Sequence, residues 1–312
     1  MAEKKTKALV LFSGGLDSRL VVKLLQEQGI DVEAVLYQLP FGSGCCNDFF
    51  CSFKFSQMEG VKLNVVDCTK GKLFQDYMKI IQKPKYGRGT AMNPCRDCRI
   101  FLLKQAKKLA KEIGADFIAT GEVLGERPMS QHKQSLMLIE KKAGLKNKVV
   151  RPLSAKLLPE TEAEKKGLAD RNKFLDIQGR YRKRQIELAE KYKIRYPLPG
   201  GGCLLCEKDY AKKIIDLFNH KKKILPEDIL LLSIGRHFRK NGKIILGKDE
   251  KENEKLELLN KKLRYHIIIP TNPGPTVIYE DKKDADVAEE IMKAYSSKDL
   301  RLREGFNDIR IR

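Results

Sequence analysis

The chain is 312 residues long, which is enough for two or three domains with cores of their own. It has 62 Lys and Arg against 41 Asp and Glu, and the formal net charge of +21 favours a polyanionic partner, most simply nucleic acid. A surface of paired charges would explain many charges of both signs, but not the excess of one sign. The sequence shows no signal peptide and no apolar run that could span a membrane, so we expect a cytoplasmic protein without a membrane partner.

Alternating strands and helices are predicted for residues 1–150. Apolar residues predict strands at 7–12, 31–38 and 62–67, with a fourth strand after Gly114. Apolar residues at helical spacing predict helices over 17–28 and 98–114. This order predicts an α/β domain with a doubly wound, mostly parallel sheet.

Two further units are predicted after residue 150. Residues 151–223 are expected to be a mostly helical extension that covers the carboxyl edge of the sheet, and residues 224–312 a smaller C-terminal α/β domain. In the extension, helices are predicted near 160–170, 180–193 and 209–220. In the C-terminal domain, strands are predicted at 229–234, 243–246, 266–270 and 276–280, and helices at 250–262 and 284–295.

A glycine-rich hexapeptide follows the first predicted strand and opens the first predicted helix. Its two glycines let backbone N–H groups approach an anion, and the helix N-terminus adds partial positive charge. The two serines can donate hydroxyl groups to phosphate oxygens, whereas the aspartate would repel phosphate unless a magnesium ion is shared between them. An ordinary capped turn is the alternative. The six residues are Ser13, Gly14, Gly15, Leu16, Asp17 and Ser18.

This hexapeptide resembles the PP-loop of the ATP pyrophosphatases, whose domain is of the adenine nucleotide α-hydrolase type. The resemblance implies that ATP is split to an adenylate and pyrophosphate, with Mg²⁺ bound and Asp17 in a catalytic role. We also expect Tyr37, Thr120 and Gly121, near the ends of the second and fourth strands, to contact the nucleotide. A Walker A sequence does not occur, which disfavours phosphoryl transfer of the kinase kind.

Two Cys-x-x-Cys pairs follow loop-forming stretches: Cys95 with Cys98, and Cys203 with Cys206. Sulfur atoms at a helix start lie near the positive end of the helix dipole, which favours the thiolate that binds metal or attacks. The residues alone leave three uses open. The cysteines could hold a structural zinc ion, carry a persulfide or redox chemistry, or supply three ligands to a [4Fe-4S] cluster that keeps one iron open.

Four more cysteines lie outside these pairs. Cys45, Cys46 and Cys51 follow the second strand in a glycine-containing loop, where they could relay sulfur or be ordinary thiols. Cys68 is expected to be a core residue at the end of the third strand.

Several segments resemble the catalytic core of tRNA thiouridine synthetases. Thr120-Gly-Glu-Val-Leu-Gly125, Ser130-Gln131 and Arg151-Pro-Leu153 are similar to the 4-thiouridine synthetases. Asn-Pro-x-x-x-Cys, here ending at Cys98, and the later Gly-x-Cys are also similar to bacterial 2-thiouridylases. The resemblance covers residues 7 to about 206.

The resemblance implies a tRNA sulfurtransferase that adenylates a uridine carbonyl and then transfers sulfur from sulfide or from a cysteine-desulfurase persulfide. It implies catalytic roles for Cys98 and Cys203 and a [4Fe-4S] cluster on Cys95, Cys98 and Cys203, with Cys206 as bystander or fourth ligand. Few residues precede the first strand, so the N-terminal RNA-binding domain of the 4-thiouridine synthetases is not expected. The modified position and the oligomeric state stay open.

Three basic segments are candidate RNA contacts, because Arg pairs with phosphate and aromatic rings stack on bases. The segment 235–239, with 243–247, resembles the RNA-binding domain of NFACT-type proteins. Solvated surface charge is the alternative in each case. The candidates are Lys83, Lys85 and Arg88; Arg180, Arg182, Lys183 and Arg184; and Arg236 and Arg239.

Two other functions remain open from the sequence. One is another PP-loop ligase or amidotransferase with a structural Zn²⁺ site, and the other is a non-catalytic RNA-binding protein that holds ATP as a structural ligand.

Overall fold

The computed structural model describes residues 5–42, 49–89, 91–197 and 202–311. The chain divides into two compact units, Met1–Leu204 and Leu205–Arg312. These limits differ from the predicted boundaries at residues 150 and 223, because Phe174 and Ala189 pack into the same core as Val10 of the first strand. None of the helices in the described ranges combines the length and the apolar character needed to cross a bilayer.

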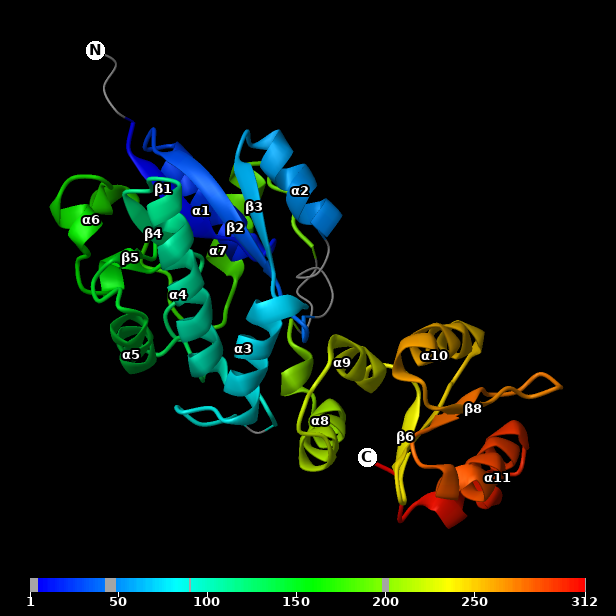
Figure 1. The fold of residues 1–312 in the computed structure, drawn as a ribbon. Helices are drawn as coiled ribbons and strands as arrows, with labels where there is room; N and C mark the ends of the chain where they lie inside the picture. The colour runs from blue at the N-terminus through cyan, green and yellow to red at the C-terminus, as the bar shows by residue number, and fades with distance from the viewer. Residues whose placement is uncertain (1–4, 43–48, 90, 198–201, 312) are drawn as a thin grey trace. The chain divides into compact units, whose positions relative to one another are not determined.

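The first unit is built on a parallel sheet in the order β3-β2-β1-β4-β5 (Figure 1). The doubly wound parallel sheet predicted from the sequence is confirmed. The strand order reverses between β1 and β4, and open α/β sheets bind ligands at this switch point, beyond the carboxyl ends of the strands. The strands are β1 (Lys7–Leu11), β2 (Asp31–Gln38), β3 (Lys62–Asp67), β4 (Phe117–Thr120) and β5 (Val149–Val150).

Helices cover both faces of this sheet, with α4 and α5 on the near side in Figure 1 and α1 and α7 behind. On the far side, Leu20 of α1 and Ala189 of α7 share a core with Ala8 and Val10. On the near side, α4 contacts β1 and β4. The helices are α1 (Leu16–Gln26), α2 (Phe49–Met58), α3 (Gly71–Gln82), α4 (Cys95–Glu112), α5 (Lys133–Ala143), α6 (Glu162–Lys165) and α7 (Lys183–Lys191). Short 3₁₀ turns are η2 (Ala155–Leu157), η3 (Arg171–Lys173) and η4 (Leu204–Cys206).

The second unit is built on an antiparallel sheet in the order β6-β7-β9-β8. Alternate residues of β7 point to opposite faces, so Ile245 packs with Leu256 of α10 while Ile244 packs with Ile291 of α11. The predicted smaller C-terminal domain is thus confirmed, with a helix on each face. Its elements are α8 (Lys208–His220), α9 (Pro226–Leu232), β6 (Arg236–Arg239), β7 (Lys243–Leu246), α10 (Glu250–Leu263), β8 (His266–Ile268), β9 (Val277–Tyr279), η5 (Lys282–Asp284), α11 (Ala285–Ser296) and η6 (Leu300–Phe306).

The predicted strand at 229–234 is wrong, since these residues belong mostly to helix α9. Pro226 occupies the start of the helix, where its missing N–H is not needed, and the Asp228 carboxylate accepts the backbone N–H of Leu225 at 2.8 Å. The four-residue apolar run was short enough to fit either a strand or a buried helix. The strand of this region is β6, which directly follows α9 in the chain.

Candidate active site

The hexapeptide 13–18 forms the turn between β1 and α1 at the switch point of the sheet. Gly14 has φ of 76°, in the left-handed region that glycine adopts without strain, and Gly15 is the N-cap of α1. The Ser18 hydroxyl donates to the carbonyl of Gly15 at 2.9 Å and lies 3.4 Å from the Ser13 hydroxyl. The two hydroxyl groups and the helix N-terminus therefore converge, as anion binding requires.

Gly121 follows β4 and lies against the N-terminus of α1. A Cβ atom at this position would come within 2.7 Å of the backbone nitrogen of Ser18 and 2.8 Å of the carbonyl carbon of Asp17. Only glycine allows so close an approach between the end of β4 and the loop. The adjacent Thr120 is buried, and its hydroxyl donates to the Glu122 carboxylate at 3.1 Å, which fixes the orientation of its side chain.

Arg19 supports the loop, although its role was not predicted. Its buried guanidinium donates to the carbonyls of Gly14 at 2.8 Å and Arg195 at 2.7 Å, and to Sγ of Cys51 at 3.0 Å. The signal in the sequence was a cation inside an otherwise apolar helix face, where an unpaired charge would be costly. Cys51 is therefore tied to the phosphate loop through Arg19.

Asp17 points into a partly buried, charged environment. Its carboxylate lies 3.7 Å from the Arg182 guanidinium, which also holds Glu126 at 2.9 Å. Burial, and then the charge of Glu126, raises the pKa of Asp17 to about 6 against the opposing effect of Arg182. One oxygen, Oδ1, is buried without a hydrogen-bond partner, which fits a position that a bound cation completes.

Arg182 was predicted to contact RNA, but the structure places it beside Asp17 in the nucleotide site. Helix α7 begins at Lys183, so residues 180–182 do not form the predicted helical turn. Arg184 pairs with Asp176 at 2.7 Å, whereas Arg180 and Lys183 are exposed and remain candidate RNA contacts.

The first Cys-x-x-Cys pair lies on the first turn of α4, which begins at Cys95 rather than at Cys98 as predicted. Sγ of Cys98 lies 3.2 Å from the hydroxyl of Tyr77, a buried residue of α3. Burial raises the pKa of Cys98, while the Tyr77 hydroxyl and the charge of Arg99 act in the opposite direction. Tyr77 was not predicted as a site residue, and its apolar helix context gave no signal for it.

The segment that carries Cys203 lies beside the residues that directly follow β2 in the sequence. Cys203 forms an antiparallel bridge with Gly42, and the backbone N–H of Leu204 donates to the carbonyl of Phe41 at 2.9 Å. The ring of Phe41 in turn lies 6.3 Å from that of Tyr77. Burial, followed by Cys98, raises the pKa of Tyr77, with a smaller contribution from Cys203. The structure therefore places Cys98 against Tyr77 and links the segment of Cys203 to the same tyrosine through Phe41.

The predicted three-cysteine ligand set is not assembled in this way. No group of three His, Cys, Asp or Glu side chains in the described ranges is arranged to hold a metal ion. Cys95 is half-buried and receives the Asn93 amide at 3.8 Å. The donor set seen here does not fit a cluster or a four-cysteine zinc site, and both remain predictions from the sequence.

The other cysteines are placed as follows. Cys68 is buried at the end of β3, as expected for a core residue, and burial raises its pKa to about 12. Cys206 is exposed and belongs to the second unit. Cys45 and Cys46 lie outside the described residues.

A buried chain of charges joins three of the sequence motifs. Glu122 accepts from Arg99 at 2.9 Å and from Arg151 at 3.0 Å, and Arg151 also pairs with Glu140. Although burial opposes it, the charges of Arg99 and Arg151 lower the pKa of Glu122 to about 2. The chain fixes α4, and with it Cys98, to the strand that ends at Thr120.

The basic loop after α3 is held by Asp97, which lies between Cys95 and Cys98 in the sequence. Its carboxylate accepts the backbone N–H groups of Lys85 at 2.9 Å and Tyr86 at 3.0 Å. Arg88 donates to the carbonyl of Gln82 at 2.8 Å, but the side chains of Lys83, Lys85 and Arg88 are exposed. Cations are thus placed next to the cysteine turn, and Lys83 and Lys85 remain candidate RNA contacts.

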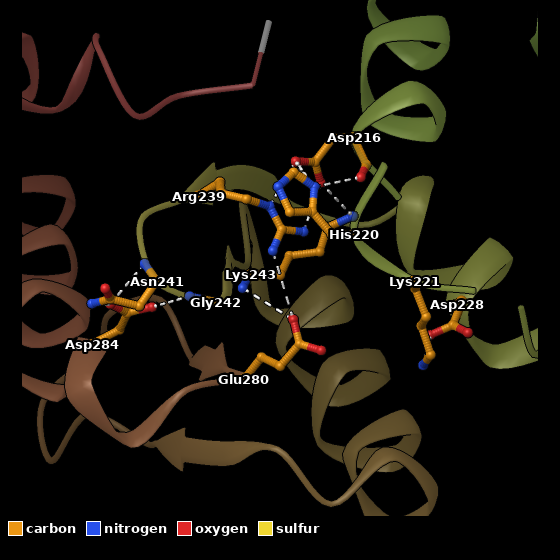
Figure 2. Close-up of polar contacts among 10 residues, drawn as sticks. All are labelled: Asp216, His220, Lys221, Asp228, Arg239, Asn241, Gly242, Lys243, Glu280 and Asp284. Carbon is orange, nitrogen blue, oxygen red and sulfur yellow. Dashed lines mark hydrogen bonds and ion pairs between the residues drawn. The ribbon is translucent and has the colours of Figure 1, made fainter. Parts of the chain in front are cut away.

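In the second unit the two arginines of β6 differ. Figure 2 shows Arg239 reaching Asp216 of α8, with bonds of 2.6 and 2.9 Å, and lying near Glu280 at 3.8 Å. Lys243, also in Figure 2, lies 3.5 Å from the same aspartate and is buried, which lowers its pKa to about 8. Arg239 therefore fastens α8 to the sheet, and only Arg236 of this pair remains a candidate RNA contact.

Comparisons with known proteins agree with the division of the chain into two units. Residues 6–148 match the family model of the tRNA methyl transferase HUP domain. Residues 235–303 match the family model of the NFACT protein RNA binding domain, as the resemblance in the sequence implied.

The curated relatives are tRNA-specific 2-thiouridylases. This chain is 32% identical over 123 residues to the tRNA-specific 2-thiouridylase of Sulfurimonas denitrificans. The aligned region covers 38% of this chain and 35% of the relative. The chain is 30% identical over 190 residues to that of Syntrophotalea carbinolica, which covers 54% of this chain and 53% of the relative. The chain thus spans a third to about half of the length of the relatives it matches.

Two solved structures are weakly similar to this chain. The U34-tRNA thiolase NcsA from Methanococcus maripaludis with its [4Fe-4S] cluster is 20% identical, with a TM-score of 0.39 over 74% of this chain and 71% of its own. A 4-thiouridine synthetase–RNA complex with bound ATP is 18% identical, with a TM-score of 0.41 over 88% of this chain and 55% of its own. TM-scores below 0.5 do not carry the cluster or the ligands of these proteins over to this chain.

Proposed function

We propose that the chain is an ATP-dependent tRNA sulfurtransferase that adenylates a uridine carbonyl oxygen and replaces it with sulfur. The observation that carries the proposal is the contact of Cys98 with Tyr77 in the unit that holds the PP-loop, with the segment of Cys203 bound to the neighbouring residues Phe41 and Gly42. The 2-thiouridylase relatives support the substrate class.

The first half-reaction is assigned to the loop 13–18. Backbone N–H groups of the loop and the serine hydroxyls hold the phosphates, and Gly121 leaves room for the loop to lie against the end of β4. The uridine oxygen attacks the α-phosphorus, and pyrophosphate leaves with the electrons of the broken P–O bond. Adenylation thereby converts the oxygen on the pyrimidine ring, a poor leaving group, into part of AMP, a good leaving group.

Magnesium fits the acidic side of this site. Asp17 would hold the ion through its unpartnered oxygen, with Glu126 near enough to raise the pKa of Asp17. When bound, the ion would neutralise phosphate charge as pyrophosphate departs. Arg182 balances the two carboxylates, so that the loop is not left with net repulsion toward ATP.

The second half-reaction is assigned to Cys98 and Cys203. The terminal sulfur of a persulfide on Cys203 attacks the adenylated ring carbon, and AMP leaves with the bonding electrons. The Cys98 thiolate then attacks Sγ of Cys203, which breaks the bond to the transferred sulfur and releases thiouridine. The resulting disulfide is reduced by an external thiol. The Cys203 thiolate then attacks the terminal sulfur of a cysteine-desulfurase persulfide, which becomes the outer sulfur of a new persulfide on Cys203 while the desulfurase cysteine leaves as a thiolate.

This two-cysteine route differs from the cluster route in its iron requirement. We expect active protein, purified without oxygen, to carry less than stoichiometric iron. About four irons per chain with broad visible absorption, both lost in Cys95→Ser, would support the three-cysteine cluster instead. One zinc per chain in colourless protein would support a structural metal site.

Serine substitutions separate the two half-reactions. Cys98→Ser and Cys203→Ser should abolish thiouridine formation while tRNA-dependent pyrophosphate release persists. Cys206→Ser, an exposed cysteine of the second unit, is the matched control and should keep both activities. Asp17→Ala should abolish both half-reactions. Undiminished thiolation by Cys98→Ser would refute the assigned sulfur chemistry, and undiminished thiolation by Asp17→Ala would refute the enzyme itself.

A further inference from the structure

Two arginine side chains lie over one tyrosine ring in the second unit. The guanidinium carbons of Arg236 and Arg303 are each 5.0 Å from the ring centroid of Tyr295. Arg236 comes from β6, whereas Tyr295 and Arg303 come from α11 and η6, which follow each other in the chain, so the cluster joins two distant segments of the sequence. An aromatic face attracts a cation and fixes its orientation.

The C-terminal segment brings a third arginine to the same place. The backbone N–H of Arg239 donates to Ile309 at 2.8 Å, and Phe238 forms an antiparallel bridge with Arg310, so this segment runs along β6. Burial and the charges of Arg310 and Arg303 lower the pKa of Arg236, against the opposing effects of Tyr295 and Glu252. Arg236 is therefore repelled by two other guanidinium groups in a half-buried site.

Positive charge exceeds negative charge around these cations in the described part of the chain: the carboxylate of Glu252, which accepts the backbone N–H of Gly235 at 3.0 Å, offsets the charge of Arg236 only in part. No carboxylate there lies within ion-pair distance of Arg236, Arg303 or Arg310, whereas the neighbouring Arg301 is held by Asp299 at 2.9 Å. Arg303 donates to the carbonyl oxygens of Ser297 at 3.0 Å and Ala294 at 3.5 Å, which caps α11 but leaves its charge uncompensated. A fold that gathers three cations near a single carboxylate gains stability when a further anion joins them.

We propose that Arg236, Arg303 and Arg310, ordered by the ring of Tyr295, form a binding site for a phosphodiester group of RNA. Guanidinium groups match phosphate oxygens in geometry and charge, and two of them held on one ring lose little freedom on binding. The choice of RNA over free phosphate rests on the proposed function, in which a large polyanion is the substrate. The site itself rests only on the arrangement of the arginines.

Binding of unmodified tRNA by the full-length chain, followed by fluorescence anisotropy over a range of salt concentrations, tests this site. Arg303→Gln and Arg236→Gln should each weaken binding about tenfold at moderate salt and lower the slope of log affinity against log salt by about one. Arg301→Gln removes the same charge from the same short helix, but its side chain is already paired and exposed. It should leave the slope nearly unchanged.

Two outcomes of these measurements would contradict the proposed RNA site. If Arg303→Gln and Arg301→Gln lower affinity and slope equally, the site does not exist and only general charge acts. If millimolar inorganic phosphate at constant ionic strength protects the wild-type second unit from heat while the variants bind tRNA normally, the ligand is free phosphate and RNA is refuted. Thermal unfolding of each variant checks that η6 still packs. Pyrophosphate release from ATP, measured in parallel, reports on the proposed enzyme separately, since the arginine cluster and the PP-loop belong to different units.

Discussion

The hydroxyl group of Tyr77 lies 3.2 Å from Sγ of Cys98, inside the first unit and away from solvent. This contact is the one polar interaction shown for the Cys98 sulfur in the described structure, and it acts against the effect of burial on the pKa of the thiol. A cysteine that must become a thiolate in a buried place depends on such a donor.

Replacing Tyr77 with Phe should therefore slow the reactions of Cys98. Loss of a hydrogen bond to a charged sulfur raises the pKa of Cys98 further, and the rate of alkylation by iodoacetamide near pH 8 should fall roughly tenfold. Mass spectrometry of the peptide that contains Cys98 measures the rate. Tyr37→Phe removes another buried hydroxyl, which has no hydrogen-bond partner, and serves as the control. Equal rates in wild type and Tyr77→Phe would show that the contact does not activate the thiol.

Nucleotide binding should depend on the ionisation of Asp17. The pKa of Asp17 is raised from 3.8 to about 6, so ionisation of this buried carboxyl destabilises the nucleotide-free fold as the pH rises between these values. Magnesium binds the ionised form, so the affinity for Mg-ATP should rise with pH through about 6 and reach a plateau above it. Calorimetric titration across this range measures the change.

Asp17→Asn is the comparison for this pH effect, because ATP itself also titrates near neutral pH. The slope that remains in the variant belongs to the nucleotide, and the difference between the two profiles belongs to Asp17. Parallel profiles for wild type and Asp17→Asn would mean that Asp17 does not hold the cation.

Gly121→Ala should disable the phosphate loop without unfolding the protein. The added Cβ would meet backbone atoms of Asp17 and Ser18 at 2.7 to 2.8 Å, so the start of α1 must move away from β4. We expect ATP affinity to fall more than tenfold, because the backbone N–H groups of the loop no longer point toward the phosphates. Gly305→Ala, where a Cβ meets nothing within 4 Å, is the matched control. Normal ATP binding by Gly121→Ala would contradict the tight approach described here.

Glu122→Gln should destabilise the first unit through the buried charges around it. The substitution leaves Arg99 unpaired and Arg151 with Glu140 alone, and breaking a buried ion pair costs about 3–5 kcal/mol. Since the pKa of Glu122 is lowered to about 2, its contribution is complete above 4.5 and is lost as the pH falls toward 2. Hydrogen exchange of the β4 and α4 peptides measures the loss. Glu289→Gln, at an exposed pair with Lys293, should change exchange little, and equal effects would refute the role of the buried chain.

The parallel domain could be predicted from the sequence because its signals are local. The strands at 31–38 and 62–67 have the predicted bounds, since runs of apolar residues end at charged or glycine-containing turns. The position of the loop 13–18 between β1 and α1 could be predicted, because its glycines, its serines and its resemblance to the PP-loop lie within six consecutive residues.

The contacts that the sequence did not reveal join residues far apart in the chain. Tyr77 meets Cys98 across 21 positions, and Arg19 meets Arg195 across 176, which no periodicity encodes. Arg182 shows the same limit, because a basic segment gives no sign of which cation turns toward Asp17. In the second unit, Arg236 and Arg239 belong to one motif, but only the fold shows that Asp216 engages one of them.

Transfer of labelled sulfur to tRNA tests the central claim most directly. Purified protein is incubated with tRNA, Mg-ATP, a thiol reductant, a cysteine desulfurase and ³⁴S-labelled cysteine, and the nucleosides of the digested tRNA are measured by mass spectrometry together with AMP. The account predicts labelled thiouridine in equal amount to AMP, and none with Asp17→Ala or Cys203→Ser. Formation of AMP without any labelled nucleoside, or labelled thiouridine without ATP, would contradict it.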